Sequence, residues 1–195
     1  CQQGESLIFA SEIKSILETM GPVEIEGNFL GARWSKLLVN SAFSGMSAAL
    51  GCTFGEVLDD PRALLCVAFI ADETVRAAHA AGHRMAPMQG EKFERFRLAS
   101  PAAVPQVLPM IRKIWSQHRQ LRASMLQDLE KGRDTEIGFI NGTVCDTGRA
   151  HGVPTPFNDR VVELVSAAQA ARGVPDFGNI ARFDDLLAPH RALSG

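Results

Sequence analysis

The sequence predicts an all-α protein. Apolar residues recur at the three- and four-residue spacing of helices along nearly the whole chain, and no run alternates apolar and polar residues over the length of a strand. Glycine and proline stand between these periodic stretches, where helices end and turns begin. The 195 residues suit one or two domains with a sizeable core, because chains of this length bury about 70% of their unfolded surface.

The first two helices are predicted before residue 51. One spans Ser6 to Met20 and ends at Gly21-Pro22, a C-cap glycine followed by a residue that cannot continue a helix. The second spans Asn28 to Leu50. Gly45 lies inside it and marks a bend, because glycine weakens a helix interior.

The middle of the chain holds two further apolar stripes. Asp60-Pro61 places a capping aspartate before a proline at the first helical position, and the helix that follows ends at Gly82. Residues 83–100 are expected to form a loop. The next stripe, over residues 104–121, predicts a helix that contains His118 on its apolar face.

The last part of the chain predicts two helices and a mixed tail. Asp134-Thr-Glu-Ile opens one helix with an acidic first turn, and this helix runs to Gly152. Thr155-Pro156 caps another, which ends at Gly173. The tail over residues 174–195 is mixed, with a short helix predicted from Ile180 to Leu187.

Composition and charge exclude several classes of protein. The chain has 20 lysine and arginine residues against 22 aspartate and glutamate residues, so its formal net charge is −2. Without a basic tract, neither nucleic acid nor an anionic membrane surface is an expected partner. No apolar run approaches the roughly 20 residues that a membrane-spanning helix needs. The four cysteines form no Cys-x-x-Cys pair, which favours the reducing cytoplasm over a secreted disulfide scaffold; they are Cys1, Cys52, Cys66 and Cys145.

The histidines and glycines predict no metal site and no nucleotide loop. His79 and His83 are four residues apart, but Gly82 between them ends the helix and no carboxylate stands at a ligand spacing. His151, beside a glycine, suits a cation at a helix C-terminus. The sequence contains neither a glycine-rich dinucleotide-binding loop nor a Walker loop. It also lacks the motifs Gly-x-Ser-x-Gly and His-Glu-x-x-His.

One line of polar residues stands out within the second predicted helix. Lys36, Asn40 and Ser44 are four residues apart, so a regular helix places them on one face between strongly apolar flanks. Such a line is either the solvent side of an amphipathic helix or the wall of a site. Taken alone it favours the solvent side, because exposed lysines greatly outnumber functional ones. Glu136, taken alone, is likewise a carboxylate that stabilises a helix N-terminus.

Six short motifs follow one another in an order that is more specific than any single motif. From the N-terminal end they are Trp34-x-Lys36-Leu-x-x-Asn40, Gly55-Glu-Val-Leu, Ser124-Met-Leu-Gln-Asp128, Gly132-Arg-x-Thr-Glu136-Ile, Asn141-Gly142 and Gly152-Val-x-Thr-Pro156-x-Asn158. In this order, over about residues 5–170, the chain resembles the C-terminal helical domain of the ketopantoate reductases, also called 2-dehydropantoate 2-reductases.

The resemblance implies a fold and a domain organisation. The fold is the multi-helix C-terminal domain of a 6-phosphogluconate-dehydrogenase-like reductase. Its partner, the N-terminal Rossmann domain, is absent from this chain. On this basis residues 1–27 are expected to be an interdomain linker with a helix remnant, residues 28–173 the helical domain, and residues 174–195 a C-terminal extension.

The resemblance also implies a reaction, the NADPH-dependent reduction of 2-dehydropantoate to pantoate in pantothenate biosynthesis. NADPH would be bound mainly by the missing domain, so this chain alone is expected to be inactive. The family's catalytic lysine maps onto Lys36, and its essential glutamate, which also contacts the cofactor, maps onto Glu136. The substrate-binding residues map onto Asn40, Ser44 and Ser124. The ammonium of Lys36 would polarise the ketone oxygen and donate a proton to it as hydride reaches the carbon.

Two alternatives stay open. Many members of the family carry asparagine where this chain has Ser44, and the shorter side chain leaves the preferred keto acid undecided. One alternative is therefore a reductase for another 2-keto acid or for an opine-type substrate. The other is a helical dimerisation or binding module without catalysis, in which Lys36 and Glu136 are surface residues. A homodimer is left open as well.

Overall fold

The computed structural model describes residues 2–23, 25–88 and 90–193, and these residues confirm the all-α prediction. The helices are α1 (Gln2–Leu17), α2 (Phe29–Val39), α3 (Gly45–Leu50), α4 (Phe54–Asp59), α5 (Pro61–Ala80), α6 (Val104–Trp115), α7 (Ser124–Glu130), α8 (Asn141–His151), α9 (Pro156–Ala170) and α10 (Asp184–Leu187). Within these described ranges the only β-type pairing is an isolated bridge between Met88 and Glu91. No helix in them is both long and apolar enough to cross a membrane.

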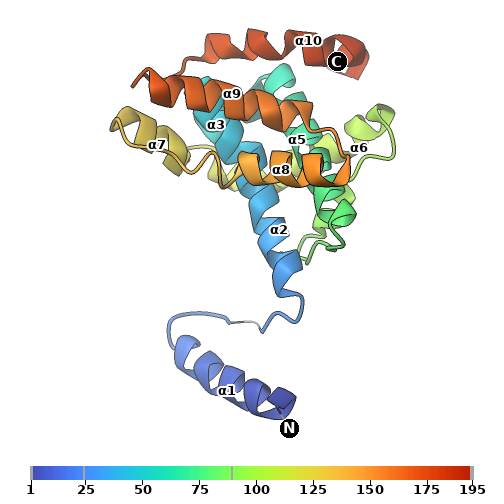
Figure 1. Cartoon of the computed structure of the whole chain (residues 1–195), viewed down its shortest axis with the longest axis vertical. Coiled ribbons are helices and arrows are strands. Elements are labelled where there is room, and N and C mark those ends of the chain that lie inside the picture. Colours follow the sequence, from blue (N-terminus) through green and yellow to red (C-terminus); the bar gives the residue numbers. More distant parts are fainter. Residues whose placement is uncertain (1, 24, 89, 194–195) are drawn as a thin grey trace.

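Helix α1 lies apart from the other helices in Figure 1, and a linker joins it to α2. The helix ends at Leu17, three residues before the predicted end, and residues 18–20 form turns. The predicted stop at Gly21-Pro22 follows directly. Ile16 is 69% exposed and Leu17 is 44% exposed, so the C-terminal part of α1 presents apolar side chains to solvent.

The predicted helix from Asn28 to Leu50 exists, but it is not a regular α-helix throughout. Asn28 caps it by accepting a hydrogen bond from the backbone N–H of Gly31 at 3.0 Å. Helix α2 then runs into a π-helical segment, Asn40–Ser44, which is followed by α3. The predicted bend at Gly45 therefore lies at the end of the π segment.

Helix α5 is the centre of the core. Asp60 caps it as predicted, because its carboxylate accepts from the N–H groups of Arg62 and Ala63 at 2.8 and 2.9 Å. Nearly every residue from Ala63 to Ala78 is buried, and the helix packs against α2, α8, α9 and α6. The loop predicted over residues 83–100 contains a short 3-10 segment, Phe93–Phe96, whose two phenylalanines are buried in the same core.

The helix predicted over residues 104–121 is shorter than expected. Helix α6 ends at Trp115, and a 3-10 turn over Ser116–His118 follows. The next carbonyl groups, of Arg119 and Leu121, accept hydrogen bonds from the N-terminal N–H groups of α4 at 2.8 and 2.9 Å. The prediction that His118 packs in the core is wrong, since the residue is exposed.

The helix predicted to open at Asp134 begins only at Asn141, so that prediction is wrong as well. Residues 136–140 form tight turns, in which the Glu136 carbonyl accepts from the N–H groups of Phe139 and Ile140 at 2.9 and 3.0 Å. Upstream, the Thr135 N–H and hydroxyl both donate to the Gln169 side chain of α9. Glu136 therefore lies in an exposed turn rather than in the first turn of a helix.

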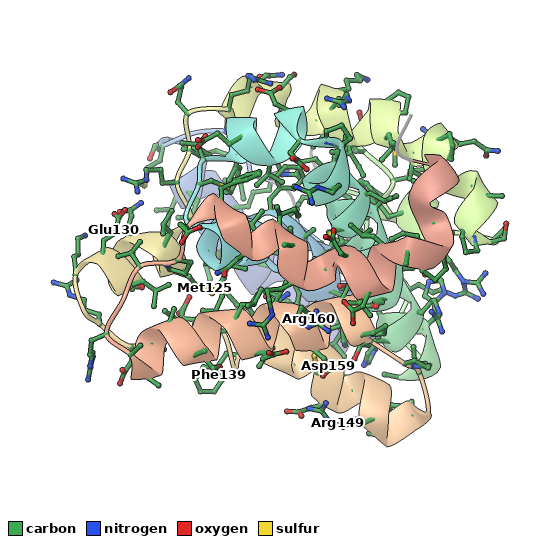
Figure 2. All side chains as sticks on the ribbon, turned by 90° about the horizontal axis from the view of Figure 1, so that it is seen from above. Met125, Glu130, Phe139, Arg149, Asp159 and Arg160 are labelled. Carbon is green, nitrogen blue, oxygen red and sulfur yellow. The ribbon has the colours of Figure 1, made fainter. Side chains whose placement is uncertain are left out.

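The C-terminal part of the chain packs on the same core. Helix α9 begins at Pro156 as predicted, although the Thr155 hydroxyl bonds to the Asp159 side chain instead of capping the backbone. The tail forms the 3-10 segment Phe177–Phe183, then α10 and a further 3-10 segment, Ala188–Leu193, and it lies above α9 in Figure 1. Ion pairs join these layers: Arg149 of α8 to Asp159 of α9 at 2.9 Å, and Arg160 of α9 to Asp185 at 3.0 Å (Figure 2).

Candidate active site

The π-helical segment forms one wall of a cavity of about 470 Å³. Asn40 and Ser44, the first and last residues of the segment, line this cavity and are half-buried. The three residues between them, Ser41, Ala42 and Phe43, are fully buried on the core side. The segment therefore turns its two polar ends toward the cavity and packs its middle into the core.

A second part of the cavity lining comes from the start of α7. Ser124, the first residue of this helix, lines the cavity and is exposed. The preceding residue, Ala123, is buried, and its N–H donates to the Ser47 hydroxyl of α3 at 3.3 Å. Ser47 also donates to the Cys52 carbonyl at 2.5 Å. These bonds fix the start of α7 against the helix that carries Asn40 and Ser44.

The floor of the cavity is apolar and aromatic. Trp115, at the end of α6, stacks on Phe43 with ring centroids 4.3 Å apart, and Phe43 also contacts Phe54 at 5.4 Å. The apolar residues that line the cavity are Val39, Phe54, Met88, Phe93, Ile114, Trp115, Leu121 and Ala123. A ligand with a hydrocarbon part and a few hydrogen-bonding groups suits such a lining.

Charged side chains lie at the rim. Lys113 pairs with Glu91 at 3.3 Å, and Arg122 pairs with Glu130, which lies on α7 (Figure 2). His118 lines the same rim. The sequence analysis did not place Lys113 or Arg122 at the site. Both cations are paired with carboxylates and Glu91 lines the cavity as well, so the charged part of the lining carries both signs.

The structure brings together three of the five predicted site residues, Asn40, Ser44 and Ser124. Lys36 lies one helical turn before Asn40, and its carbonyl accepts the N–H of Asn40, but its side chain is exposed and does not line the cavity. Glu136 is also exposed and outside the cavity lining. The described residues contain no group of three or more histidine, cysteine, aspartate or glutamate side chains that could hold a metal ion.

Comparison with known families identifies one match that covers most of the chain. The model for the C-terminal domain of ketopantoate reductase PanE/ApbA matches residues 28–169. A 2-dehydropantoate 2-reductase of Pyrococcus horikoshii is 30% identical over 166 residues, which are 85% of this chain and 49% of that protein. One from Escherichia coli O157:H7 is 29% identical over 161 residues, 82% of this chain and 46% of that protein. The chain thus spans about half the length of these curated relatives.

Solved structures show the same fold. A D-mandelate dehydrogenase solved as a ternary structure with NADH and anilino(oxo)acetate superposes with a TM-score of 0.68 at 25% identity, over 85% of this chain and 62% of that one. A PanE/ApbA family ketopantoate reductase from Ralstonia eutropha superposes with a TM-score of 0.66 at 24% identity, over 83% of this chain and 49% of that one.

Proposed function

This chain belongs to the ketopantoate reductase family, and we propose that it is the substrate-binding helical half of an NADPH-dependent reductase that converts 2-dehydropantoate to pantoate. The observation that carries this proposal is the cavity, which gathers Asn40, Ser44 and Ser124 from two separate parts of the chain. These are the positions that the resemblance assigns to substrate binding. Their amide and hydroxyl groups can bind a hydroxyl and a carboxylate without adding charge.

The same proposal assigns the activity to a longer protein. The relatives are about twice as long as the matched segment, and the sequence here has no glycine-rich loop for a pyrophosphate. An N-terminal nucleotide-binding domain would therefore bind most of NADPH, with residues 28–173 as the helical domain, residues 1–27 as the linker and residues 174–195 as an extension. The exposed positions of Lys36 and Glu136 agree with this arrangement, because both side chains are accessible to a second domain that covers the cavity.

In this proposal each site residue of the chain has a separate role in the reaction. NADPH, when bound, supplies the hydride for the ketone carbon. Asn40, Ser44 and Ser124 hold the keto acid, and the guanidinium of Arg122, which also lines the cavity, attracts its carboxylate. Lys36 stabilises the negative charge that develops on the ketone oxygen and donates the proton that completes the alcohol. The exposed carboxylate of Glu136 accepts hydrogen bonds from the cofactor or the substrate.

The test is NADPH oxidation by the longer protein that contains this chain, measured by absorbance with 2-dehydropantoate. Lys36→Ala is compared with Lys131→Ala, a second exposed lysine that does not line the cavity. We expect Lys36→Ala to lower kcat at least about a hundredfold, the contribution of a general acid, and Lys131→Ala to leave it unchanged. If no 2-keto acid is reduced, or if both variants keep full activity, the catalytic proposal is wrong and a helical binding module remains.

A second candidate is a reductase for an aryl 2-keto acid. The aromatic floor formed by Phe54, Phe93 and Trp115 favours it, as does Ser44, which is shorter than the family's usual asparagine. A structural relative was also solved with anilino(oxo)acetate, a 2-keto acid derivative that carries a ring. A kcat/KM for phenylglyoxylate above that for 2-dehydropantoate would favour this candidate, and Ser44→Asn should then shift the preference back.

A further inference from the structure

The π segment is an irregular feature that the neighbouring helices hold in place. In an α-helix the N–H of Gly45 would bond to the carbonyl of Ser41, four residues before it. Here the N–H of Gly45 donates instead to the carbonyls of Asn40, five residues before it, and of Ala42, three residues before it. The carbonyl of Ser41 is thereby released from its usual partner. Single π turns of this kind are frequent at functional sites.

Asn141, the first residue of α8, binds the released carbonyl. It is fully buried, and its Nδ2 donates to the Ser41 carbonyl at 3.0 Å and to the Asn158 Oδ1 at 2.9 Å. The close approach requires glycine at position 45. A Cβ there would lie 2.8 Å from the Asn141 Oδ1 and 3.0 Å from its Nδ2.

A second row of bonds fixes the orientation of Asn141. The Asn158 Nδ2 donates to the carboxylate of Glu73 at 2.8 Å, so the Asn158 Oδ1 has to face Asn141. Glu73 also accepts from the backbone N–H groups of Phe157 and Asn158 at 3.0 and 2.9 Å. The Nδ2 of Asn141 thus donates to two acceptors. Its buried Oδ1 has no hydrogen-bond partner in the described structure.

Asn141 provides a donor aimed at the Ser41 carbonyl, which has lost its α-helical partner, the N–H of Gly45. The turn is also held from α5, where the Thr74 hydroxyl lies 3.1 Å from that of Ser41.

We propose that Asn141 is a positioning residue for the keto acid: its bond to the Ser41 carbonyl maintains the π turn that presents Asn40 and Ser44 to the cavity. This inference rests on the proposed function, because Asn40 and Ser44 bind substrate only if that function holds. Asn141 itself does not line the cavity and acts through the backbone. Without its bond the segment is free to return to the α-helical pattern, which rotates Asn40 and Ser44 relative to each other.

The first test compares Asn141→Leu with Val144→Ala in the longer, active protein. Leucine has a similar size but cannot donate to Ser41. Val144 is a fully buried residue in the same helix, and its truncation leaves the hydrogen bonds of the π turn intact. We expect Asn141→Leu to raise the KM for the keto acid about tenfold or more, with the KM for NADPH within about twofold. Equal changes in both variants at matched losses of Tm would overturn the proposal.

The second test is independent of activity and of the folding of Asn141→Leu. Gly45→Ala places a methyl group against the Asn141 amide and should displace it, although alanine favours the helix. Amide hydrogen exchange is measured on the wild-type chain and on both variants. We expect a changed protection factor at position 45 in each variant that folds, because the N–H there changes its acceptor, with unchanged protection in α5. An unchanged protection factor at position 45 would refute the role of Asn141 even if the enzyme is a reductase, whereas a changed one in a protein without reductase activity would refute only the proposed function.

Discussion

The carboxyl group of Glu73 makes the stability of this fold depend on pH. The side chain lies on α5 and the residue is only 3% exposed. Burial raises the pKa of Glu73 from its ordinary value of 4.5 to about 7. The hydrogen bonds from Phe157 and Asn158 act in the opposite direction, and the nearby charge of Asp72 adds to the rise. The folded protein therefore keeps a proton on Glu73 at pH values where the unfolded chain has lost it.

The sign and size of the effect follow from the two pKa values. Below pH 4.5 the carboxyl is protonated in both states, so its contribution to stability is fully present. Between pH 4.5 and about 7 only the unfolded chain releases the proton, so the free energy of unfolding falls as the pH rises. A pKa difference of this size corresponds to at most about 3 kcal/mol, since one pKa unit is worth about 1.4 kcal/mol.

The assay is urea unfolding of the wild-type chain and of Glu73→Gln at a series of pH values. Glutamine does not titrate, so the wild type should lose up to about 3 kcal/mol relative to the variant between pH 4.5 and 7. Asp72 is present in both proteins, and its effect cancels in the difference. Asp185→Asn is a control of opposite sign, because Arg160 lowers the pKa of Asp185 and its effect falls below pH 3.8. A constant difference between wild type and Glu73→Gln from pH 4.5 to 7 would refute the reasoning.

Three further predictions test the helix ends and the core. Asp60→Ala should destabilise the fold by about 1 kcal/mol, because it removes the cap of α5, whereas Asp60→Asn should unfold at nearly the wild-type urea concentration. Gly51→Ala should cost at least about 2 kcal/mol, since φ is +62° and a Cβ would lie 1.9 Å from the Pro175 carbonyl oxygen. Gly82→Ala, also at positive φ but in open space, should cost only about 1 kcal/mol; equal losses in Tm would contradict the clash. Cys52, Cys66 and Cys145 should react with iodoacetamide only after unfolding, as peptide mass mapping would show. Burial raises the pKa of the Cys52 and Cys145 thiols to about 12 and also raises the pKa of the Cys66 thiol well above its ordinary value.

The sequence predicts the helices well where a local pattern decides them. The cap at Asp60 needs only an aspartate before a proline, and the structure shows both of its hydrogen bonds. The helix ends that were predicted wrongly lie beside long-range contacts instead. The carbonyls of Arg119 and Leu121, beyond the end of α6, accept hydrogen bonds from α4, and Asn141 at the start of α8 donates to Ser41. Helical periodicity contains no information on such partners.

At the candidate site, too, the local sequence pattern predicts one part of the arrangement and long-range contacts determine the rest. The four-residue spacing of Asn40 and Ser44 placed them on one helix, and only the resemblance connected them with Ser124, which is far away in the sequence. The structure brings the three residues to one cavity and adds His118 and Arg122, which follow a helix end that the sequence does not mark. Lys36 and Glu136 stay predictions, because the described residues place both on the surface.

The π segment explains why spacing alone was insufficient at this site. Four residues of an α-helix turn through about 400°, whereas four residues of a wider π turn fall short of a full circle, so Asn40 and Ser44 do not keep the register that a regular helix gives. The sequence nevertheless contains the cause of this change. Gly45 admits the Asn141 amide, and Asn141 binds the carbonyl that the π turn releases. The Asn-Gly pair at residues 141–142, one of the motifs that carry the resemblance to the family, therefore acts in this structure through a contact with a helix 100 residues earlier.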